Sequence, residues 1–296
     1  MNIIITGCSG FLGKHLIKEI INEKQNWEIF NVDRENTGNQ FFNFTKKNLQ
    51  NKLEWIAYLK DKNPDIIYHL IGSHNIDDKE KMLETNAKQS LNLFESILSL
   101  NIDPIVVIIG SAAQYGKVNP KDNPIAEDYK QKPTSFYGYT KKWQEEIALH
   151  FHQKYGIKVI CTRPSNFIGK GISSKLFPGF LNSQFLKNES QINIEISSKD
   201  SIRDYVDVRD VSKALVKIGE TKACIGETFN ISSSNGVSNE QLINLYSQIS
   251  RKKAIIKENR KNDSLKISMS NKKLKSYIDW EIKYQLNESI EWSLNQ

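Results

Sequence analysis

Short apolar runs alternate with amphipathic segments through the first half of the chain. The runs are typical of buried strands and lie at residues 3–5, 28–33, 65–70, 105–109 and 158–162. Between them, apolar side chains recur at helical spacing in residues 11–24, 49–62, 85–100 and 137–155. Strands that alternate with helices indicate βαβ units, whose parallel sheet is covered by helices on both faces. We therefore predict an α/β fold with a doubly wound parallel sheet of the Rossmann type.

The alternation stops after Pro164, and a polar, irregular stretch follows over residues 165–201. Further on, Ser238 and Gln241 form a capping-box pattern that begins another helix. No internal repeat and no Pro/Gly-rich linker divides the chain. We expect a dinucleotide-binding domain of residues 1–164 plus 205–231, and a smaller α/β substrate domain of residues 165–204 plus 232–296 over the carboxyl edge of the sheet.

The composition and charge of the chain argue against several classes of protein. Hydrophobic residues make up 39% of the 296 residues, which is enough for a core, and no apolar run reaches the length of a transmembrane helix. Residues 1–7 hold no basic side chain before the apolar stretch, so we expect no signal peptide. The net charge of +7 comes from basic residues that are mostly spread along the chain, which argues against a nucleic-acid partner.

The cysteines are informative about the compartment. Cys8, Cys161 and Cys224 are far apart in the sequence and form no CxxC pattern. A disulfide framework or a zinc site is therefore not expected, and a reducing cytoplasm fits such thiols. We predict a cytoplasmic protein without a metal and without a membrane partner.

A glycine-rich segment follows the first strand and opens the first helix. Gly7, Gly10 and Gly13 let the backbone turn sharply and approach a pyrophosphate, and the amino end of the helix supplies N–H groups. Asp33 ends the second strand, 20 residues after Gly13, where a carboxylate would bind the hydroxyl groups of an adenosine ribose. This combination predicts a dinucleotide site.

Tyr137 and Lys141 stand four residues apart, which places a phenol and an ammonium group on one helix face. A neighbouring positive charge favours the phenolate and lowers the pKa of the phenol. Such a tyrosine can exchange a proton with an alcohol or sugar oxygen while a hydride moves at the adjacent carbon. Ser111 follows the fourth strand, at the edge where ligands of such folds bind, and its hydroxyl would share the substrate oxygen.

Together these residues resemble the extended short-chain dehydrogenase/reductases, that is, the NAD-dependent epimerase/dehydratase family of nucleotide-sugar enzymes. The resemblance runs over nearly the whole chain. It is carried by the glycine loop, His69-Leu70-Ile71-Gly72, Asn86, the SAAQYG string from Ser111, Tyr137 with Lys141, Arg163-Pro-Ser-Asn166-Phe-Ile-Gly, Arg203-Asp-Tyr-Val-Asp-Val-Arg-Asp210, Phe229-Asn230-Ile231 and Asp279-Trp280.

The resemblance implies a role for each matching residue. Ser111, Tyr137 and Lys141 would form the catalytic triad, and Ser111, Asn166 and Arg203 would contact the substrate, the last two near its nucleotide diphosphate. An ion pair with a neighbouring aspartate is the alternative role for Arg203. The cofactor, NAD with NADP as the alternative, would be held by Gly7, Gly10, Phe11, Leu12, Gly13, Asp33, Arg34, Asn43, Phe44, Leu70, Ile71, Gly72, Asn86, Tyr137, Lys141 and Pro164. Within this set, Pro164 would lie beside the nicotinamide, and Asn43 takes the place of a family aspartate that contacts adenine.

Two alanines discriminate between subfamilies. Sugar 4,6-dehydratases that resemble this chain carry Asp-Glu where Ala112 and Ala113 stand, and 3,5-epimerase/reductases similar to fucose synthase carry a cysteine at the second position. Neither alanine side chain can donate a proton, so both of these reactions are disfavoured. What remains is hydride and proton transfer at a single carbon. We predict an NAD(P)-dependent reductase acting at C4 of a nucleotide-activated 4-keto sugar, nearest to the nucleotide-4-keto-6-deoxyhexose reductases. The alternatives are a nucleotide-hexose 4-epimerase and a non-catalytic NAD(P)-binding regulator.

Two further expectations concern the cofactor and the assembly. The carboxylate of Asp33 would repel a 2′-phosphate, whereas Arg34 beside it would attract one, so NAD and NADP both stay open. In the family that the chain resembles, two neighbouring helices pair with their symmetry mates across a four-helix interface. We therefore predict a homodimer whose interface uses Leu93, Ile97, Trp143 and Ile147.

Overall fold

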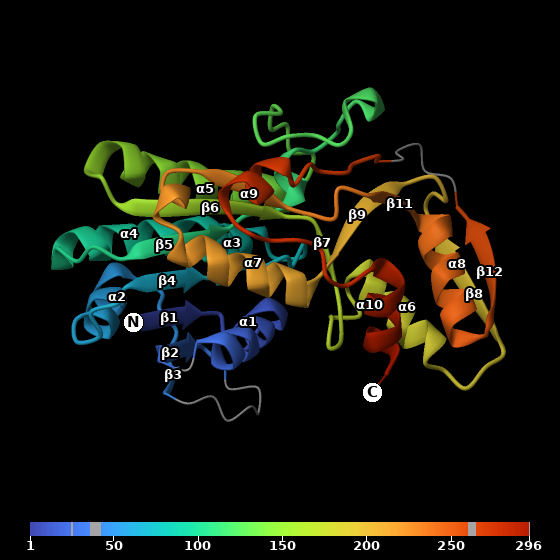
Figure 1. Ribbon diagram of the computed structural model, residues 1–296, viewed down its shortest axis with the longest axis horizontal. Coiled ribbons are helices and arrows are strands. Elements are labelled where there is room, and N and C mark those ends of the chain that lie inside the picture. The colour runs from blue at the N-terminus through green and yellow to red at the C-terminus, as the bar shows by residue number, and fades with distance from the viewer. Residues whose placement is uncertain (25, 36–42, 260–264, 296) are drawn as a thin grey trace.

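A seven-stranded parallel sheet forms the centre of the larger part of the molecule (Figure 1). The computed structural model describes residues 1–24, 26–35, 43–259 and 265–295. The strand order is β10-β6-β5-β4-β1-β2-β3, the order of a doubly wound sheet, so the predicted fold class is confirmed. The strands are β1 (Asn2–Thr6), β2 (Glu28–Asp33), β3 (Phe44–Lys46), β4 (Ile66–His69), β5 (Ile105–Ile109), β6 (Lys158–Pro164) and β10 (Thr228–Ile231).

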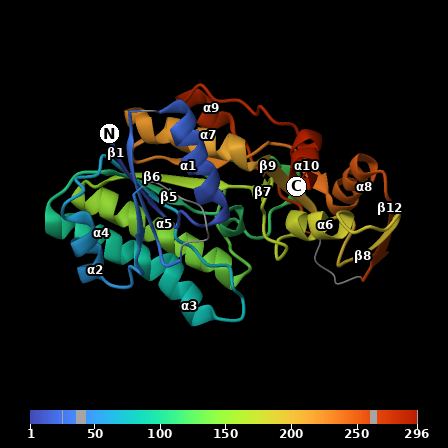
Figure 2. The same cartoon turned by 90° about the horizontal axis from the view of Figure 1, so that it is seen from below.

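Helices cover both faces of this sheet, as an all-parallel sheet of apolar strands requires (Figure 2). Ile3 and Ile5 on β1 point into one core and Ile4 points into the other, because successive side chains of a strand alternate between faces. One face carries α1 (Phe11–Glu23), α7 (Val208–Glu220) and α9 (Lys272–Tyr277), and the other carries α2 (Lys52–Leu59), α4 (Gln89–Leu100) and α5 (Phe136–Tyr155).

Short helical pieces complete this part of the chain. The 5-residue helix α3 (Lys79–Leu83) continues through a π-helical turn, η1 (Glu84–Lys88), into α4. Three 3₁₀ turns are η2 (Ala112–Gln114), η3 (Pro120–Asp122) and η4 (Lys222–Cys224). Turn η2 follows β5 directly, so it sits at the carboxyl edge of the sheet, where the predicted site lies.

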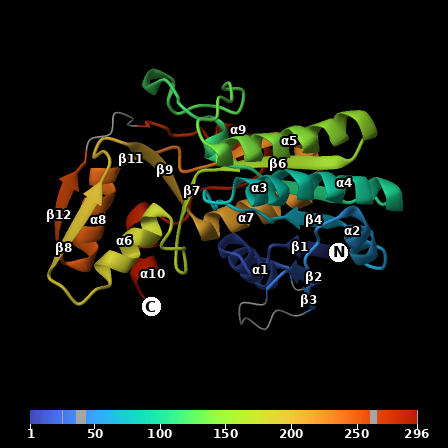
Figure 3. The same cartoon turned by 180° about the vertical axis from the view of Figure 1, so that it is seen from behind.

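The side of α4 that we predicted to be exposed is buried in the structure. Leu93 and Ile97, predicted for a dimer interface, are buried in the core between this helix and the sheet. Leu91 and Leu98 are exposed instead, at 36% and 38%. Apolar residues occupy both sides of this helix, so their spacing alone does not decide which side meets the sheet. Helices α4 and α5 lie side by side on this face (Figure 3).

A smaller unit stands beyond the carboxyl edge of the sheet (Figure 1). Ser238 caps its helix α8 as predicted, since the Ser238 and Gln241 side chains each bond the other's backbone N–H. The unit has its own apolar core, which includes Leu181, Tyr246 and Ile290. Its elements are β7 (Asn166–Ile168), α6 (Phe177–Phe185), β8 (Gln191–Ile196), β9 (Ile202–Asp207), β11 (Gly236–Ser238), α8 (Asn239–Ser250), β12 (Lys253–Glu258) and α10 (Leu286–Leu294).

One part of the expected domain division needs adjustment. Helix α9 falls in residues 232–296, which the sequence assigned to the substrate domain. Leu274, Ile278 and Trp280 nevertheless pack into the core of the large sheet, and the Trp280 indole donates a hydrogen bond to the Asp210 carbonyl. We therefore place α9 with the dinucleotide-binding half, and the remaining division stays a prediction.

Among the described residues, no helix combines the length and the apolar character that crossing a bilayer requires. The same described ranges contain no group of three or more His, Cys, Asp or Glu side chains arranged to hold a metal ion.

Candidate active site

The loop between β1 and α1 forms a tight cradle. Gly7 adopts φ +67°, in the left-handed region that favours glycine. A Cβ on Gly13 would lie 2.6 Å from the Gly7 carbonyl oxygen, so a larger residue would not fit. Helix α1 begins after Gly10 without a side-chain cap, which leaves its first-turn N–H groups to a ligand. These features fit the pyrophosphate of a dinucleotide.

The side chains at the start of α1 face the protein rather than the loop. Leu12 is buried in the core, and the Phe11 ring packs against His15 and Phe167. Phe11 and Leu12, both predicted to bind the cofactor, can therefore contact a ligand only through their backbone N–H groups.

Asp33 ends β2 beside this cradle. Its carboxylate accepts the backbone N–H of Ser9 at 3.0 Å and that of Arg34 at 2.7 Å. The Arg34 side chain is exposed and lies 4.0 Å from the Glu35 carboxylate. Backbone N–H groups thus orient the Asp33 carboxylate, whereas the Glu35 carboxylate partly neutralises the Arg34 guanidinium.

A cavity of about 1140 Å³ opens at the carboxyl edge of the sheet. Its volume slightly exceeds the usual range of about 300–1,000 Å³ for small-molecule and cofactor sites. Among the predicted cofactor residues, it is lined by Gly7, Gly10, Asp33, Arg34, Leu70, Ile71 and Gly72. The cavity therefore joins the glycine loop, the end of β2 and the segment after β4 into one site.

Asn43 and Phe44, predicted to bind the cofactor with Asn43 at its adenine, do not line this cavity. Strand β3 begins at Phe44, so Asn43 stands at its amino end, away from the edge where ligands bind. Asn43 lines a different cavity of about 380 Å³, together with Trp27. Asn48 and Leu49 follow the carboxyl end of β3 and line the large cavity instead. A prediction of β3 would have found them.

Ser111 and Tyr137 meet between η2 and the first turn of α5. The Ser111 hydroxyl accepts the Ala113 N–H at 3.2 Å, so its own proton is free to be donated. Burial raises the pKa of the Tyr137 phenol, and the neighbouring Ser111 hydroxyl offsets part of that rise. The phenol is therefore neutral at physiological pH in this structure, ready to give a proton.

Lys141 lies one helical turn beyond Tyr137 and is buried. Its ammonium group donates to the Ile109 carbonyl and to Gln144 Oε1, both at 2.9 Å. No carboxylate is among these partners, and burial lowers the pKa of Lys141 to about 8. Gln144, three residues on along the same helix, was not predicted from the sequence although its spacing places it beside Lys141.

Asn86 acts on the site through the protein. Its side-chain amide exchanges two hydrogen bonds with the backbone of Ser73 and donates a third to Thr140 Oγ1 at 2.9 Å. The residue is fully buried. These bonds tie the segment after β4 to α5, and the contact of Asn86 with the cofactor stays a prediction.

The predicted substrate residues come from the strands that enter the smaller unit. Arg203 donates through Nη1 to the carbonyls of Ile202 and Leu265, and no ion pair joins it to a carboxylate of a described residue. The alternative of an ion pair with a neighbouring aspartate is thus not seen there. The Asn166 amide donates to the Asp204 carbonyl at 2.9 Å, and Pro164 ends β6 in a buried position.

A Rossmann sheet with this glycine cradle, and with a serine, a tyrosine and a lysine at its carboxyl edge, defines the class of extended short-chain dehydrogenase/reductases. Residues 3–232 match the NAD dependent epimerase/dehydratase family, and the chain belongs to that family. The predictions of an enzyme and of a nicotinamide dinucleotide cofactor are confirmed.

Three proteins illustrate the similarity. The GDP-6-deoxy-D-talose 4-dehydrogenase of Aggregatibacter actinomycetemcomitans is 29% identical over 88% of this chain and 83% of its own. The GDP-6-deoxy-D-mannose reductase of Pseudomonas aeruginosa is 24% identical over 97% of this chain and 94% of its own. In fold, the UDP-glucose 4-epimerase of Thermotoga maritima superimposes with a TM-score of 0.88, at 24% identity, over 99% of this chain and 97% of its own.

Proposed function

We propose that the protein is an NAD(P)H-dependent reductase that acts at C4 of a nucleotide-activated 4-keto sugar. The observation that carries this proposal is the pair Ala112 and Ala113 beside Ser111. These side chains have no proton to exchange, so the site has hydroxyl, phenol and ammonium groups but no added acid or base at this turn. The name of one relative, a 4-dehydrogenase of a GDP-linked deoxysugar, supports chemistry at this carbon, and the name of another, a reductase, supports the direction of the reaction.

In the proposed reaction the bound cofactor supplies the hydride. Tyr137 gives its proton to the C4 oxygen, and the Ser111 hydroxyl hydrogen-bonds the same oxygen. The Lys141 charge stabilises the phenolate that Tyr137 becomes after the transfer. The Ser111 hydroxyl acts on the pKa of Tyr137, which supports the proposal that both groups bind one substrate atom.

The residues present fit a dinucleotide. The first-turn N–H groups of α1 would hold the pyrophosphate, the Asp33 carboxylate would bind the adenosine ribose, and Asn48 with Leu49 would contact adenine. Pro164 would lie beside the nicotinamide. On the substrate side, Asn166 and Arg203 would bind the nucleotide diphosphate, because the guanidinium has protein carbonyls but no described carboxylate as partners.

The direct test is a panel of nucleotide sugars and their 4-keto derivatives, followed at 340 nm with NADH and with NADPH. We expect stoichiometric oxidation of the cofactor with a nucleotide-4-keto-6-deoxyhexose. Dehydration of a 4-hydroxy sugar, or no turnover of any 4-keto sugar, would contradict the proposal.

A second candidate is a nucleotide-hexose 4-epimerase, which the fold similarity to a UDP-glucose 4-epimerase keeps open. Such an enzyme takes a hydride from C4 and returns it to the other face, so it holds its cofactor through every cycle. We expect the purified reductase to carry little bound nucleotide. Denaturation that releases about one equivalent per chain, with hexose interconversion and no added cofactor, favours the epimerase.

We also propose a cytoplasmic homodimer. All three cysteines are free and buried thiols, which fits a reducing compartment. The surface of α4 and α5 presents Leu91, Leu98, Tyr139 and Trp143 with 36% to 44% exposure, and a second copy of the same surface would cover them. Ile147 is partly buried against the core, so it contributes less than predicted.

A further inference from the structure

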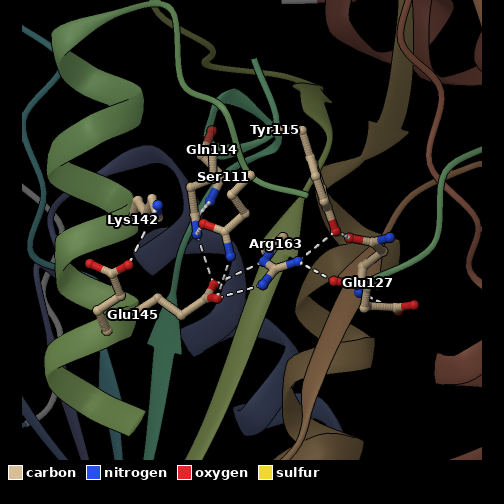
Figure 4. A network of polar contacts seen from close by, with 10 residues as sticks. Ser111, Gln114, Tyr115, Glu127, Lys142, Glu145 and Arg163 are labelled. Atoms are coloured by element: carbon tan, nitrogen blue, oxygen red, sulfur yellow. Dashed lines mark hydrogen bonds and ion pairs between the residues drawn. The ribbon is translucent and has the colours of Figure 1, made fainter. Parts of the chain in front are cut away.

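A buried network of polar side chains links Ser111 to α5 (Figure 4). Its centre is Gln114, which is fully buried. The Gln114 carbonyl oxygen accepts the Ser111 backbone N–H at 2.7 Å, and its amide nitrogen donates to Glu145 Oε2 at 2.8 Å. Resting on the proposed function, we propose that Gln114 is a positioning residue that fixes the Ser111 hydroxyl relative to Tyr137.

The far end of this link is anchored by an ion pair. Arg163 donates to both carboxylate oxygens of Glu145, at 2.9 and 2.5 Å, and both side chains are buried. Burial raises the pKa of Glu145, but the bonds and charge of Arg163 outweigh it, so the pKa lies below its ordinary value. The carboxylate is therefore a permanent acceptor for the Gln114 amide.

Arg163 is itself held by neutral partners. Its remaining nitrogen donates to Tyr115 Oη and to the Glu127 carbonyl, each at 2.8 Å. This places the guanidinium between α5, the loop at residue 127 and the turn that carries Ser111. The anchor cannot shift without breaking several buried hydrogen bonds.

Glu145 connects the network to the catalytic helix. It lies on α5 four residues after Lys141, and Lys141 lies four residues after Tyr137, so the three share one face of the helix. Gln114 thus joins the turn of Ser111 to the same face that carries the phenol and the ammonium group. The distance between the two hydroxyl groups is set by this connection.

The chemistry of the link requires an amide. One end must accept an N–H and the other must donate to a carboxylate, which a glutamine side chain does and a hydrocarbon does not. A charged carboxylate in its place would face Glu145 at hydrogen-bond distance and repel it. The Gln114 side chain also fills the space beside Gly110, because a Cβ on Gly110 would lie 2.2 Å from Gln114 Oε1.

The first test needs no substrate. Hydrogen–deuterium exchange of the cofactor-free protein, read in peptides spanning residues 109–116, should be at least about tenfold faster at Ser111 in Gln114→Met than in the wild type. The matched control is Gln131→Met. Gln131 bonds the same Glu145 carboxylate at 2.9 Å and accepts a 3.3 Å hydrogen bond from the Gln114 amide, but it does not touch Ser111. Equal exchange in Gln114→Met and the wild type overturns the proposed link.

The second test is a double-mutant cycle with GDP-4-keto-6-deoxymannose and NADH. Gln114→Met should lower kcat by about 10- to 100-fold with little change in the Kd of NADH, and Gln131→Met should not. In a Ser111→Ala background, Gln114→Met should cost less than about twofold, because its effect passes through the lost hydroxyl. Full multiplication of the two losses overturns the proposal. If Ser111→Ala alone leaves turnover unchanged, the proposed function fails, independently of the exchange result.

A conservative variant keeps the test decisive if Gln114→Met does not fold. In Gln114→Glu, the introduced carboxyl stands next to a carboxylate, which raises its pKa. When protonated it accepts and donates as the amide does, so activity should be retained at low pH and lost as pH rises through that pKa. A kcat profile identical to that of the wild type contradicts a positioning role.

Discussion

The ammonium group of Lys141 lies directly behind the backbone of Gly72: a Cβ at residue 72 would stand 3.2 Å from Nζ. Gly72 lines the large cavity, so this pair connects the helix of the proposed catalytic residues to the wall of the proposed cofactor site. Lys141 has little freedom to withdraw, since the Ile109 carbonyl and Gln144 hold it at 2.9 Å. The size of residue 72 therefore controls both the cavity and the position of the charge.

We expect Gly72→Val to weaken NADH binding by more than about tenfold and to lower kcat as well, because its branches must enter the cavity or displace Nζ. Gly72→Ala is the matched control. Its single methyl needs a shift of only a few tenths of an ångström, so its Kd should change by less than about threefold. Fluorescence titration of both variants measures this, and equal Kd values for the valine variant and the wild type would contradict the arrangement.

Tyr137→Phe removes the proposed proton donor. We expect kcat to fall by about 10²- to 10⁴-fold, the usual contribution of a general acid, while the Kd of NADH stays within about threefold. Tyr139→Phe is the control, because that phenol is 44% exposed and lies on the helix surface. Stopped-flow or steady-state kinetics at 340 nm decide the matter. A loss of less than about tenfold at residue 137 would show that another group gives the proton.

The pKa of Lys141, lowered to about 8 by burial, predicts a pH limb. Its charged form supports Tyr137, and that form is lost as pH rises through 8 in the free enzyme. We therefore expect kcat/KM for the dinucleotide, which reports free-enzyme groups, to fall about tenfold per pH unit above this value. A profile that is flat to pH 9.5 would contradict it.

The same shift has a consequence for stability. Between pH 8 and the ordinary value of 10.5, the unfolded chain binds the Lys141 proton and the folded chain does not. The free energy of unfolding of the wild type should therefore rise with pH across this window relative to Lys141→Met. Denaturant titrations of both proteins at several pH values measure the difference, and a falling difference would mean that the folded pKa is not lowered.

The limits of sequence reasoning are clear at two places. The strand at residues 3–5 is apolar throughout and was predicted from its composition, whereas β3 has three residues and exists through its pairing with β2 at Asn31 to Asp33. Without that strand, the sequence placed the predicted adenine contact on Asn43, five residues before Asn48, which lines the large cavity. Pairing between segments distant in sequence leaves no local pattern, so the error was one of tertiary context.

The proposed catalytic residues and their buried neighbours also differ in how far the sequence predicts them. Tyr137 and Lys141 have a spacing that a helix makes meaningful, and Ser111 follows an apolar strand, so all three were predicted as candidates. Gln114 and Gln144 are polar residues that sequence reasoning leaves at the surface, yet both are fully buried. Their partners, Glu145 and Ser90, come from other elements, and only the packing of α5 against η2 and α4 brings them together.

Cofactor choice follows from the charge around Asp33. The carboxylate is fixed by two backbone N–H groups, and Arg34 beside it lies near Glu35. A 2′-phosphate would meet this carboxylate, so we expect kcat/KM to favour NADH over NADPH. Asp33→Ser should reduce that preference by more than about tenfold by removing the charge. A wild-type preference for NADPH would mean that Arg34 dominates.

The last prediction concerns assembly. Trp143 packs edge-on against Phe136 and lies beside Tyr139, and these rings form a partly exposed aromatic cluster on α5. In an isologous dimer, the cluster of each chain would be covered by the same surface of its partner. We expect light scattering to give about twice the chain mass of 34.1 kDa at micromolar concentration. Trp143→Glu should yield a particle of one chain with an unchanged far-UV spectrum, because a carboxylate in the centre of an apolar interface is costly to desolvate.

The matched control is Ile255→Glu, which changes an apolar residue with 40% exposure on β12, far from this surface, and should leave the dimer intact. A wild-type particle of a single chain mass would refute the dimer, and dissociation by both variants would place the interface elsewhere.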